Sequence, residues 1–152
     1  MTTRLDHQAL VPDGMRALGG VYQYVVGKSG LPAGLVDLVY LRVSQINGCA
    51  YCISMHSHDL LRAGTPVPKL MLLSVWREAG DLFTSRERAA LAWAESVTLV
   101  AQTGVPDAAF EAAAREFSPK ELADLTLAVG VINTYNRMAI SFRRTPDTGA
   151  AV

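Results

Sequence analysis

The sequence has few cysteines and no excess of charge. It contains two cysteines among 152 residues, which excludes the disulfide framework that holds many small secreted proteins together. Its 14 basic and 14 acidic residues give a formal net charge of zero, so it lacks the electrostatic footprint of a protein that binds nucleic acid or an anionic membrane surface. We therefore expect a small substrate or a protein partner, with no nucleic acid and no membrane.

Long apolar runs are also missing. Residues 1–7 lack the apolar core of a signal peptide, and no stretch reaches the ~18 consecutive apolar residues of a membrane span. We interpret the protein as cytoplasmic. In that reducing compartment a lone CxxC motif is more often catalytic, redox-active or metal-binding than a structural disulfide.

The alternating pattern of β-strands is absent, and the fold class is therefore predicted as all-α with about seven helices. A chain of this length matches one domain, residues 1–152, with a disordered tail at about residues 143–152. Two capping boxes, Thr84 with Glu87 and Ser118 with Glu121, mark helix starts. Apolar spacing and caps predict helices over residues 12–26, 32–46, 49–63, 70–76, 84–102, 106–117 and 119–142.

The chemistry of the chain is concentrated between residues 47 and 56. If Cys49 opens a helix, Cys49, Cys52 and His56 share one face, with the Cβ atoms of the cysteines about 5 to 6 Å apart. A helix N-terminus stabilises a thiolate because its unpaired N–H groups and dipole favour negative charge. His56 could then take the proton of Cys52, directly or through one water molecule.

A carboxylate that orients the histidine would complete this set, and Asp37 is the candidate. If the two helices fold back on each other at Gly48, Asp37 lies about 16 Å and His56 about 12 Å from the turn, so Asp37 is nearer to His56 than to Cys52. A solvated helix residue is the alternative interpretation of Asp37. Tyr51 and Ser44 are candidate pocket residues.

Two other interpretations of the cysteines stay open. Free cysteines are often simply buried apolar residues. Alternatively, Cys49, Cys52 and His56 could bind zinc, with Asp37 or water as the fourth ligand. His58 points to a different face from His56, and we expect both His58 and His7 to be exposed.

The segment Leu41-Arg-Val-Ser-Gln-Ile-Asn-Gly-Cys-Ala-Tyr-Cys-Ile-Ser-Met-His56 resembles the alkyl hydroperoxidase D (AhpD) family within the carboxymuconolactone decarboxylase-like superfamily. The segments at residues 76–78, 86–91 and 132–137 are similar to later parts of that family. The resemblance spans about residues 32 to 140. It implies an AhpD-like helical bundle with the CxxC at the N-terminus of a central helix, assembled as a homotrimer or homohexamer.

The resemblance also implies roles for individual residues. Cys52 would be the thiol that attacks peroxide, Cys49 the resolving thiol exposed to the reductant, and His56 the base. The relay carboxylate of the family lies twelve residues before the first cysteine, at Asp37. The family normally has glutamate there, so the shorter Asp37 could need a water to reach the histidine. A histidine often precedes the second cysteine, where this chain has Tyr51.

The expected function is that of an alkyl hydroperoxide reductase, which reduces hydrogen or alkyl hydroperoxides through a Cys49–Cys52 disulfide in antioxidant defence. It would need no bound cofactor and no metal, only an external dithiol reductant such as a lipoyl or thioredoxin-like protein. Decarboxylating branches lack the cysteine pair, which argues against that activity. The alternative is a non-catalytic metal- or ligand-binding stress-response protein of the same fold. Asn133, Asn136 and Arg137 could line the pocket or contact a neighbouring subunit, and a subunit contact is the first prediction.

Overall fold

Helices make up the structure, a computed structural model that describes residues 2–146. The elements are α1 (His7–Leu10), α2 (Pro12–Gly27), α3 (Ala33–Asn47), α4 (Ala50–Arg62), α5 (Val67–Met71), η1 (Leu73–Glu78), η2 (Gly80–Leu82), α6 (Ser85–Thr98), α7 (Val100–Thr103), α8 (Asp107–Ala114) and α9 (Pro119–Phe142). The two η elements are 3-10 helices. Strands are absent from the described residues, so the all-α prediction is confirmed.

The described elements are more numerous than the seven predicted helices. The predicted helix at 70–76 is instead α5 followed by η1, with the break at Leu72, and the backbone of Val75 within η1 is also not helical. The predicted helix at 84–102 divides at Leu99 into α6 and α7. The four-residue α1 was not predicted, although Asp6 caps it through its side chain. Residues 147–152 of the predicted tail lie outside the described residues.

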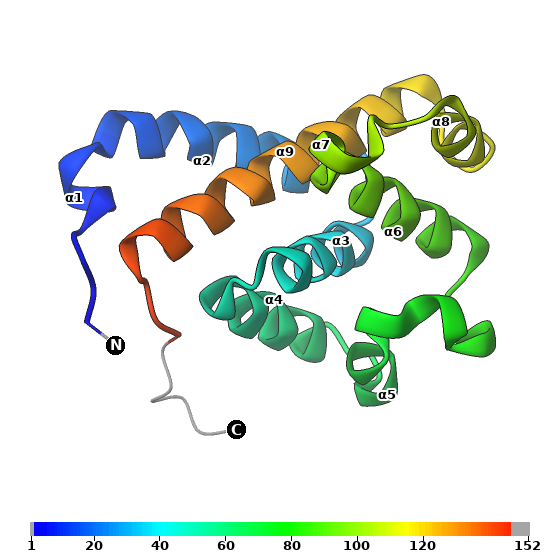
Figure 1. Ribbon diagram of the computed structural model, residues 1–152, viewed down its shortest axis with the longest axis horizontal. Helices are drawn as coiled ribbons and strands as arrows, with labels where there is room; N and C mark the ends of the chain where they lie inside the picture. Colours follow the sequence, from blue (N-terminus) through cyan, green and yellow to red (C-terminus); the bar gives the residue numbers. More distant parts are fainter. Residues whose placement is uncertain (1, 147–152) are drawn as a thin grey trace.

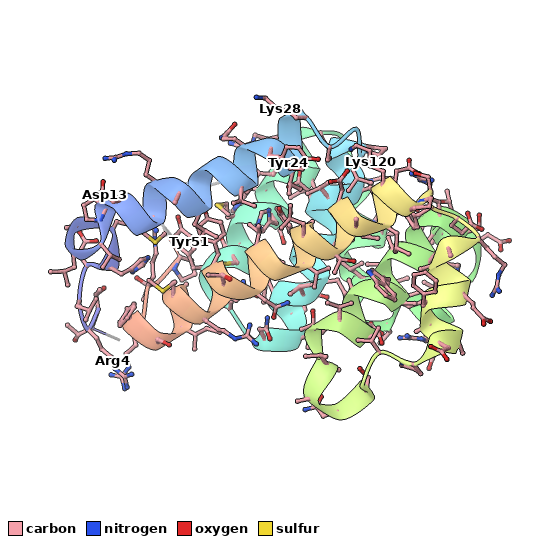
Figure 2. All side chains as sticks on the ribbon, turned by 90° about the horizontal axis from the view of Figure 1, so that it is seen from above. Arg4, Asp13, Tyr24, Lys28, Tyr51 and Lys120 are labelled. Atoms are coloured by element: carbon pink, nitrogen blue, oxygen red, sulfur yellow. The ribbon has the colours of Figure 1, made fainter. Side chains whose placement is uncertain are left out.

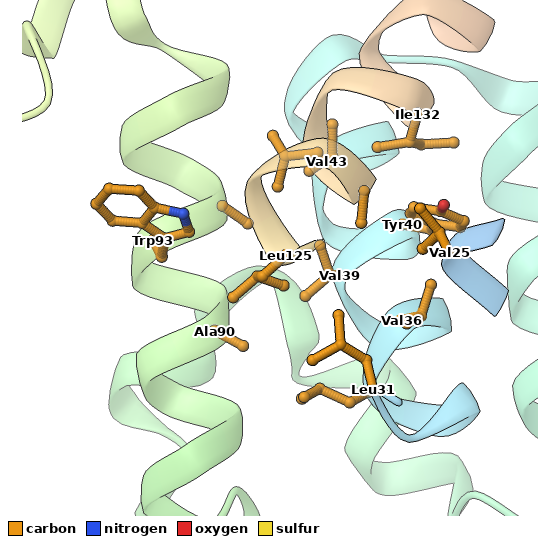
Figure 3. Packing of buried hydrophobic residues seen from close by; sticks show 14 of the residues in the cluster. Val25, Leu31, Val36, Val39, Tyr40, Val43, Ala90, Trp93, Leu125 and Ile132 are labelled. Atoms are coloured by element: carbon orange, nitrogen blue, oxygen red, sulfur yellow. The ribbon is translucent and has the colours of Figure 1, made fainter. Parts of the chain in front are cut away.

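Helix α3 occupies the centre of the fold, with α4, α6 and α9 around it (Figure 1). Its side chains are buried on several faces, including Val36, Val39, Tyr40, Leu41 and Val43. Figure 3 shows part of this core, in which Val39 and Val43 of α3 share one apolar cluster with Trp93 of α6 and Ile132 of α9. A helix that is apolar on most sides belongs in the interior.

A partly buried charge cluster links α3 to α6 and η1. Glu95 of α6 accepts hydrogen bonds from Arg42 of α3 at 2.7 Å, Trp76 of η1 at 2.9 Å and Arg77 at 2.5 Å. Burial alone would raise the pKa of Glu95, but these donors outweigh it and lower the pKa. The segment η1, which was not predicted as a separate 3-10 helix, is therefore hydrogen-bonded to α6.

Gly48 makes the turn that places the CxxC motif. It has a φ of 71°, in the left-handed region that glycine adopts without strain, and it ends α3. Asp37 of α3 contacts His56 of α4, so the two helices do fold back on each other. None of the helices among residues 2–146 has the length and apolar character that crossing a membrane requires.

Candidate functional site

The two thiols meet at the start of α4. Cys49 is the N-cap residue rather than the first helical residue, and its backbone N–H donates to the carbonyl of Ser44 at 3.0 Å. The Sγ atoms of Cys49 and Cys52 are 2.9 Å apart and hydrogen-bonded, and both cysteines are free. The side chains are only 1% and 2% exposed. The expectation that Cys49 is exposed to a reductant is therefore wrong for the single chain.

One proton is shared across this sulfur pair. The hydrogen bond from the Cys52 thiol stabilises a thiolate at Cys49 and lowers the pKa of Cys49 to about 7, even though burial opposes the charge. Because Cys52 donates that bond and is itself buried beside the Cys49 charge, the pKa of Cys52 is raised. Near neutral pH the pair can carry one negative charge.

Asn136 of α9 holds the sulfur pair from behind. Its side chain is fully buried. The hydrogen bond within the sulfur pair is the largest influence on both thiols, and a smaller contribution from the Asn136 amide favours the thiolate of each, adding to the lowered pKa of Cys49 and partly opposing the raised pKa of Cys52. The amide is fixed in turn, because it donates to Ser44 Oγ at 3.0 Å and accepts from Asn47 Nδ2 at 2.9 Å. Asn136 therefore belongs to the site, and its prediction as part of a subunit contact is wrong.

The other two residues of that prediction differ from Asn136. Asn133 is half-buried and accepts from Asn47 at 3.0 Å, which extends the same network within the chain. Arg137 is exposed and donates to Asn133 at 2.8 Å. Polar residues late in a helix could have been assigned to a buried network only once α3 was known to pack on α9.

His56 and Asp37 form the predicted pair directly. His56 is 1% exposed, and its Nδ1 lies 3.3 Å from Asp37 Oδ1, so no bridging water is needed despite the short aspartate. Nε2 of His56 is buried and has no hydrogen-bond partner among the described residues. Consequently His56 makes no direct hydrogen bond to Cys52. The ring packs edge-on against Tyr40, with centroids 5.1 Å apart.

A cavity of about 280 Å³ opens beside Cys52 and His56. Its wall is formed by α1, α2, α3, α4, α9 and the residue Arg144 that follows α9. The lining residues are His7, Gln8, Met15, Tyr22, Tyr40, Tyr51, Cys52, Met55, His56, Ile132, Tyr135, Ala139 and Arg144. Tyr51 lies on this wall, between α2 and the C-terminal half of α9 (Figure 2). Ser44 does not, because it is buried behind the thiols against Asn136. Cys52, and not Cys49, faces the cavity.

Both ends of the described chain contribute residues that the sequence did not point to. The guanidinium of Arg144 lies 4.0 Å from the centre of the Tyr51 ring and helps to stabilise a negative charge on Cys52, which favours a lower pKa. His7 is 7% exposed and stacks on Phe142, with centroids 5.5 Å apart, so its predicted exposure is wrong. His58 is exposed as expected. No periodic or motif signal marks His7 or Arg144.

The predicted zinc ligands do not form one cluster among the described residues. The group that brings one ligand atom each within 4.8 Å of the others is Asp37, His56 and Asp59, without the thiols. Asp59 is also paired with Arg62 on the next turn of α4. The cysteines and the carboxylates thus contribute to different parts of the site.

Comparison with known proteins decides the family. The family model of the carboxymuconolactone decarboxylase family matches residues 12–96, which include the thiols, His56 and Asp37. The chain belongs to this family. It is 31% identical over 141 residues to the uncharacterized protein YdfG of Bacillus subtilis, covering 93% of this chain and 95% of that protein.

Within the carboxymuconolactone decarboxylase family the chain is AhpD-like. The crystal structure of ATU0492 from Agrobacterium tumefaciens, a protein of unknown function whose name relates it to the antioxidant defence protein AhpD, superposes with a TM-score of 0.92. The two chains are 39% identical, with 97% and 99% coverage. Alkyl hydroperoxide reductase AhpD of Nocardia farcinica is 38% identical over 52 residues, or 34% of this chain and 28% of that enzyme.

Proposed function

We propose that this protein is a thiol-dependent peroxidase that reduces hydrogen or alkyl hydroperoxides through a disulfide between Cys49 and Cys52. The observation that carries the proposal is the reduced sulfur pair, 2.9 Å apart, with Cys52 on the wall of a cavity that also contains His56. A sulfenic acid formed at Cys52 would have a second thiol within immediate reach. The relationship to alkyl hydroperoxide reductase AhpD of Nocardia farcinica supports the same chemistry.

The first step of the proposed reaction is attack by Cys52. Its thiolate sulfur forms a bond to the distal peroxide oxygen, the O–O bond breaks, and the departing alkoxide takes a proton to become an alcohol. The raised pKa of Cys52 and the lowered pKa of Cys49 make Cys52 the protonated partner of the sulfur pair, so its proton must first leave, to Cys49 or to Nε2 of His56. The unpaired Nε2 is an acceptor when Nδ1–H donates to Asp37, and it reaches the thiol through water or the substrate.

The second step closes the disulfide. The Cys49 sulfur attacks the sulfenic sulfur of Cys52, an S–S bond forms, and the oxygen leaves as water. An external dithiol such as a lipoyl or thioredoxin-like protein then reduces the bond by exchange and is itself oxidised to a disulfide. Because Cys49 is buried in the single chain, this exchange requires the start of α4 to open, or it begins at Cys52 through the cavity. No bound cofactor is needed.

The test measures the thiols directly. One equivalent of peroxide should remove both thiols and reduce the intact mass by two hydrogens, and dithiothreitol should restore them. Cys49→Ser should stop at a sulfenic acid that a dimedone-type probe traps at Cys52, whereas Cys52→Ser should react far more slowly. An unchanged mass in the wild-type protein, or equal peroxide consumption in both variants, rejects the proposal.

A metal-binding protein of the same fold is the second candidate function. The cluster of Asp37, His56 and Asp59 favours it, because imidazole and carboxylate groups are ligands for several divalent metals. Protein purified without chelator would then contain stoichiometric metal, Asp59→Asn would lose it, and the thiols would not react with peroxide. Metal-free protein with reactive thiols excludes this candidate.

A further inference from the structure

Among residues 2–146, the wall of the cavity beside Cys52 includes one permanent cation and no acidic group. The cation is Arg144, which also borders a neighbouring hollow lined by Thr3, Leu5, Asp6, His7 and Gln8. The interior side chains include Met15, Met55, Ile132 and Ala139, which offer an apolar surface. A ligand that fills this space is therefore expected to be apolar in its body and negative at one end.

Arg144 is held in a position to bind an anion. Its backbone N–H donates to the carbonyl of Ala139 at 2.9 Å, and its guanidinium stacks on Tyr51. Stacking uses the face of a guanidinium and leaves its N–H edge available for a bidentate carboxylate. None of the ion pairs formed among residues 2–146 involves Arg144.

Two buried polar atoms of the wall residues have no hydrogen-bond partner among residues 2–146. They are Nε2 of His56 and the hydroxyl of Tyr40, whose side chains are 1% and 0% exposed. A buried polar atom without a hydrogen bond costs about 1–3 kcal/mol, so both atoms favour a ligand group that donates and accepts. A hydroperoxide group does both, and the sulfur of Cys52 lies on the same wall.

We propose that the substrates of this site are small organic hydroperoxides that carry a carboxylate, with the carboxylate on Arg144 and the O–O bond at Cys52. This inference rests on the proposed peroxidase function and adds the substrate class to it. The volume of about 280 Å³ limits the body to one ring or a short chain. Attack by the Cys52 thiolate on the distal oxygen then yields the Cys52 sulfenic acid and, after protonation, a carboxylate-bearing alcohol.

The first arm of the test measures binding without turnover. The Cys52→Ser protein is titrated with 4-isopropylbenzoate and with the neutral 4-isopropylbenzamide. The carboxylate should bind at least about 10-fold more tightly, which corresponds to about 1.4 kcal/mol. Adding Arg144→Gln should abolish this difference. Adding Arg143→Gln, which removes the same charge at the exposed neighbouring residue, should preserve it.

The second arm measures the reaction. Cumene hydroperoxide is compared with its 4-carboxylate in protein that retains both cysteines. The ratio of the two rate constants for thiol oxidation should be about 10 or more in the wild type, close to one in Arg144→Gln, and partly restored in Arg144→Lys. The ratio is compared, rather than either rate constant alone, because removing Arg144 should also slow the oxidation of Cys52 by the neutral peroxide.

The two arms separate this inference from the proposed function. Reactive thiols with no preference for the carboxylate, or a preference that survives Arg144→Gln, overturn the substrate class and leave the peroxidase intact. Arg144-dependent binding of 4-isopropylbenzoate in protein whose thiols do not react with any peroxide supports carboxylate recognition and rejects the peroxidase.

Discussion

At the scale of single residues, His56 is the candidate base of the proposed reaction. General acid–base catalysis typically contributes about 10²–10⁴-fold, so His56→Gln should lower the rate constant for peroxide oxidation of Cys52 by about 100-fold or more. His58→Gln is the matched control, because that histidine is exposed and only bonds the carbonyl of Ser54. Stopped-flow measurement of sulfenic acid formation gives both rates. A loss below twofold in His56→Gln would exclude it as the base.

We expect Asp37 to act through His56, so its substitutions should slow thiol oxidation to different degrees. Asp37→Asn keeps the shape but removes the charge that orients and stabilises the imidazole, so it should slow thiol oxidation less than His56→Gln does. Asp37→Glu keeps the carboxylate and should retain most of the rate. Rates measured as a function of pH distinguish this role from a structural one, because Asp37→Asn should shift the pH profile as well as lower it. An unchanged profile would make Asp37 a structural residue.

Asn136 should set the acidity of the sulfur pair. The wild-type thiols should react with iodoacetamide with an apparent pKa of about 7, so the rate falls as the pH drops below that value. Asn136→Ala removes hydrogen bonds to both sulfurs and should move this pKa upward. It also leaves the buried Ser44 hydroxyl without its Asn136 partner and removes one of the two hydrogen bonds of the Asn47 amide, which should cost about 1–3 kcal/mol of unfolding free energy.

Two further variants test whether Asn136 itself sets the pKa of the sulfur pair. Ser44→Ala removes a partner that positions the amide, and should raise the pKa by less than Asn136→Ala does. Arg137→Ala, an exposed change on the same helix, should leave the alkylation profile unchanged. An unshifted pKa in a folded Asn136→Ala protein would contradict the role assigned to Asn136.

At the scale of helices, the N-terminal cap of α9 makes the free energy of unfolding depend on pH in the acid range. The Ser118 backbone N–H and the Arg86 guanidinium both donate to the Glu121 carboxylate and lower its pKa to about 2. A depressed pKa in the folded state stabilises the fold above the unfolded-state pKa of about 4.5, and that contribution is lost as pH falls toward 2. Glu121→Gln should therefore be less stable at pH 7 and show a smaller loss between pH 5 and pH 2.

The measurement for Glu121 is thermal or urea unfolding followed by circular dichroism across that pH range. Glu116→Gln is a suitable control, because the Glu116 side chain makes only a weak contact with Ser85 at 3.4 Å. If Glu121→Gln and the wild type lose stability in parallel below pH 5, the capping carboxylate does not contribute as described.

The sequence predicted the helices that have strong local signals. The capping boxes at Thr84 and Ser118 are present as predicted, because a capping box is a contact within four residues. The reversal of the chain at Gly48 and the position of Asp37 along α3, next to His56, also followed from local rules. The breaks at Leu72 and Leu99 were not predicted. Apolar periodicity carries no signal of tertiary contacts such as the hydrogen bond from Trp76 of η1 to Glu95 of α6.

The parts of the site that lie far apart in sequence were not predictable. Asn136 reaches the thiols because α9 packs on α3, a contact between residues 92 positions apart. Arg144 reaches Tyr51 because the backbone of Arg143 turns into the left-handed region at the end of α9. Such contacts depend on how helices pack, so a single sequence considered alone offers no pattern that would reveal them.

At the scale of the whole molecule, the surface of the single chain retains large apolar side chains. Met71 is 74% exposed, Leu10 66%, Val100 56% and Phe110 53%. A further apolar hollow lies between α6, α8 and α9, where Trp93 meets Phe110. A protein with zero net charge and this much apolar surface gains by association, because burying such side chains removes them from water.

We therefore expect a homo-oligomer, a trimer or hexamer as the family resemblance implies. Light scattering coupled to size exclusion should give three or six times the chain mass of 16.3 kDa at micromolar concentration. Because apolar contacts rather than ion pairs would hold the subunits, about 1 M sodium chloride should not dissociate them, although it screens charges beyond about 3 Å. Low concentrations of a mild detergent should dissociate them instead. A single species of 16.3 kDa would show that the exposed apolar residues serve another partner, and dissociation by salt alone would show that charges hold the assembly.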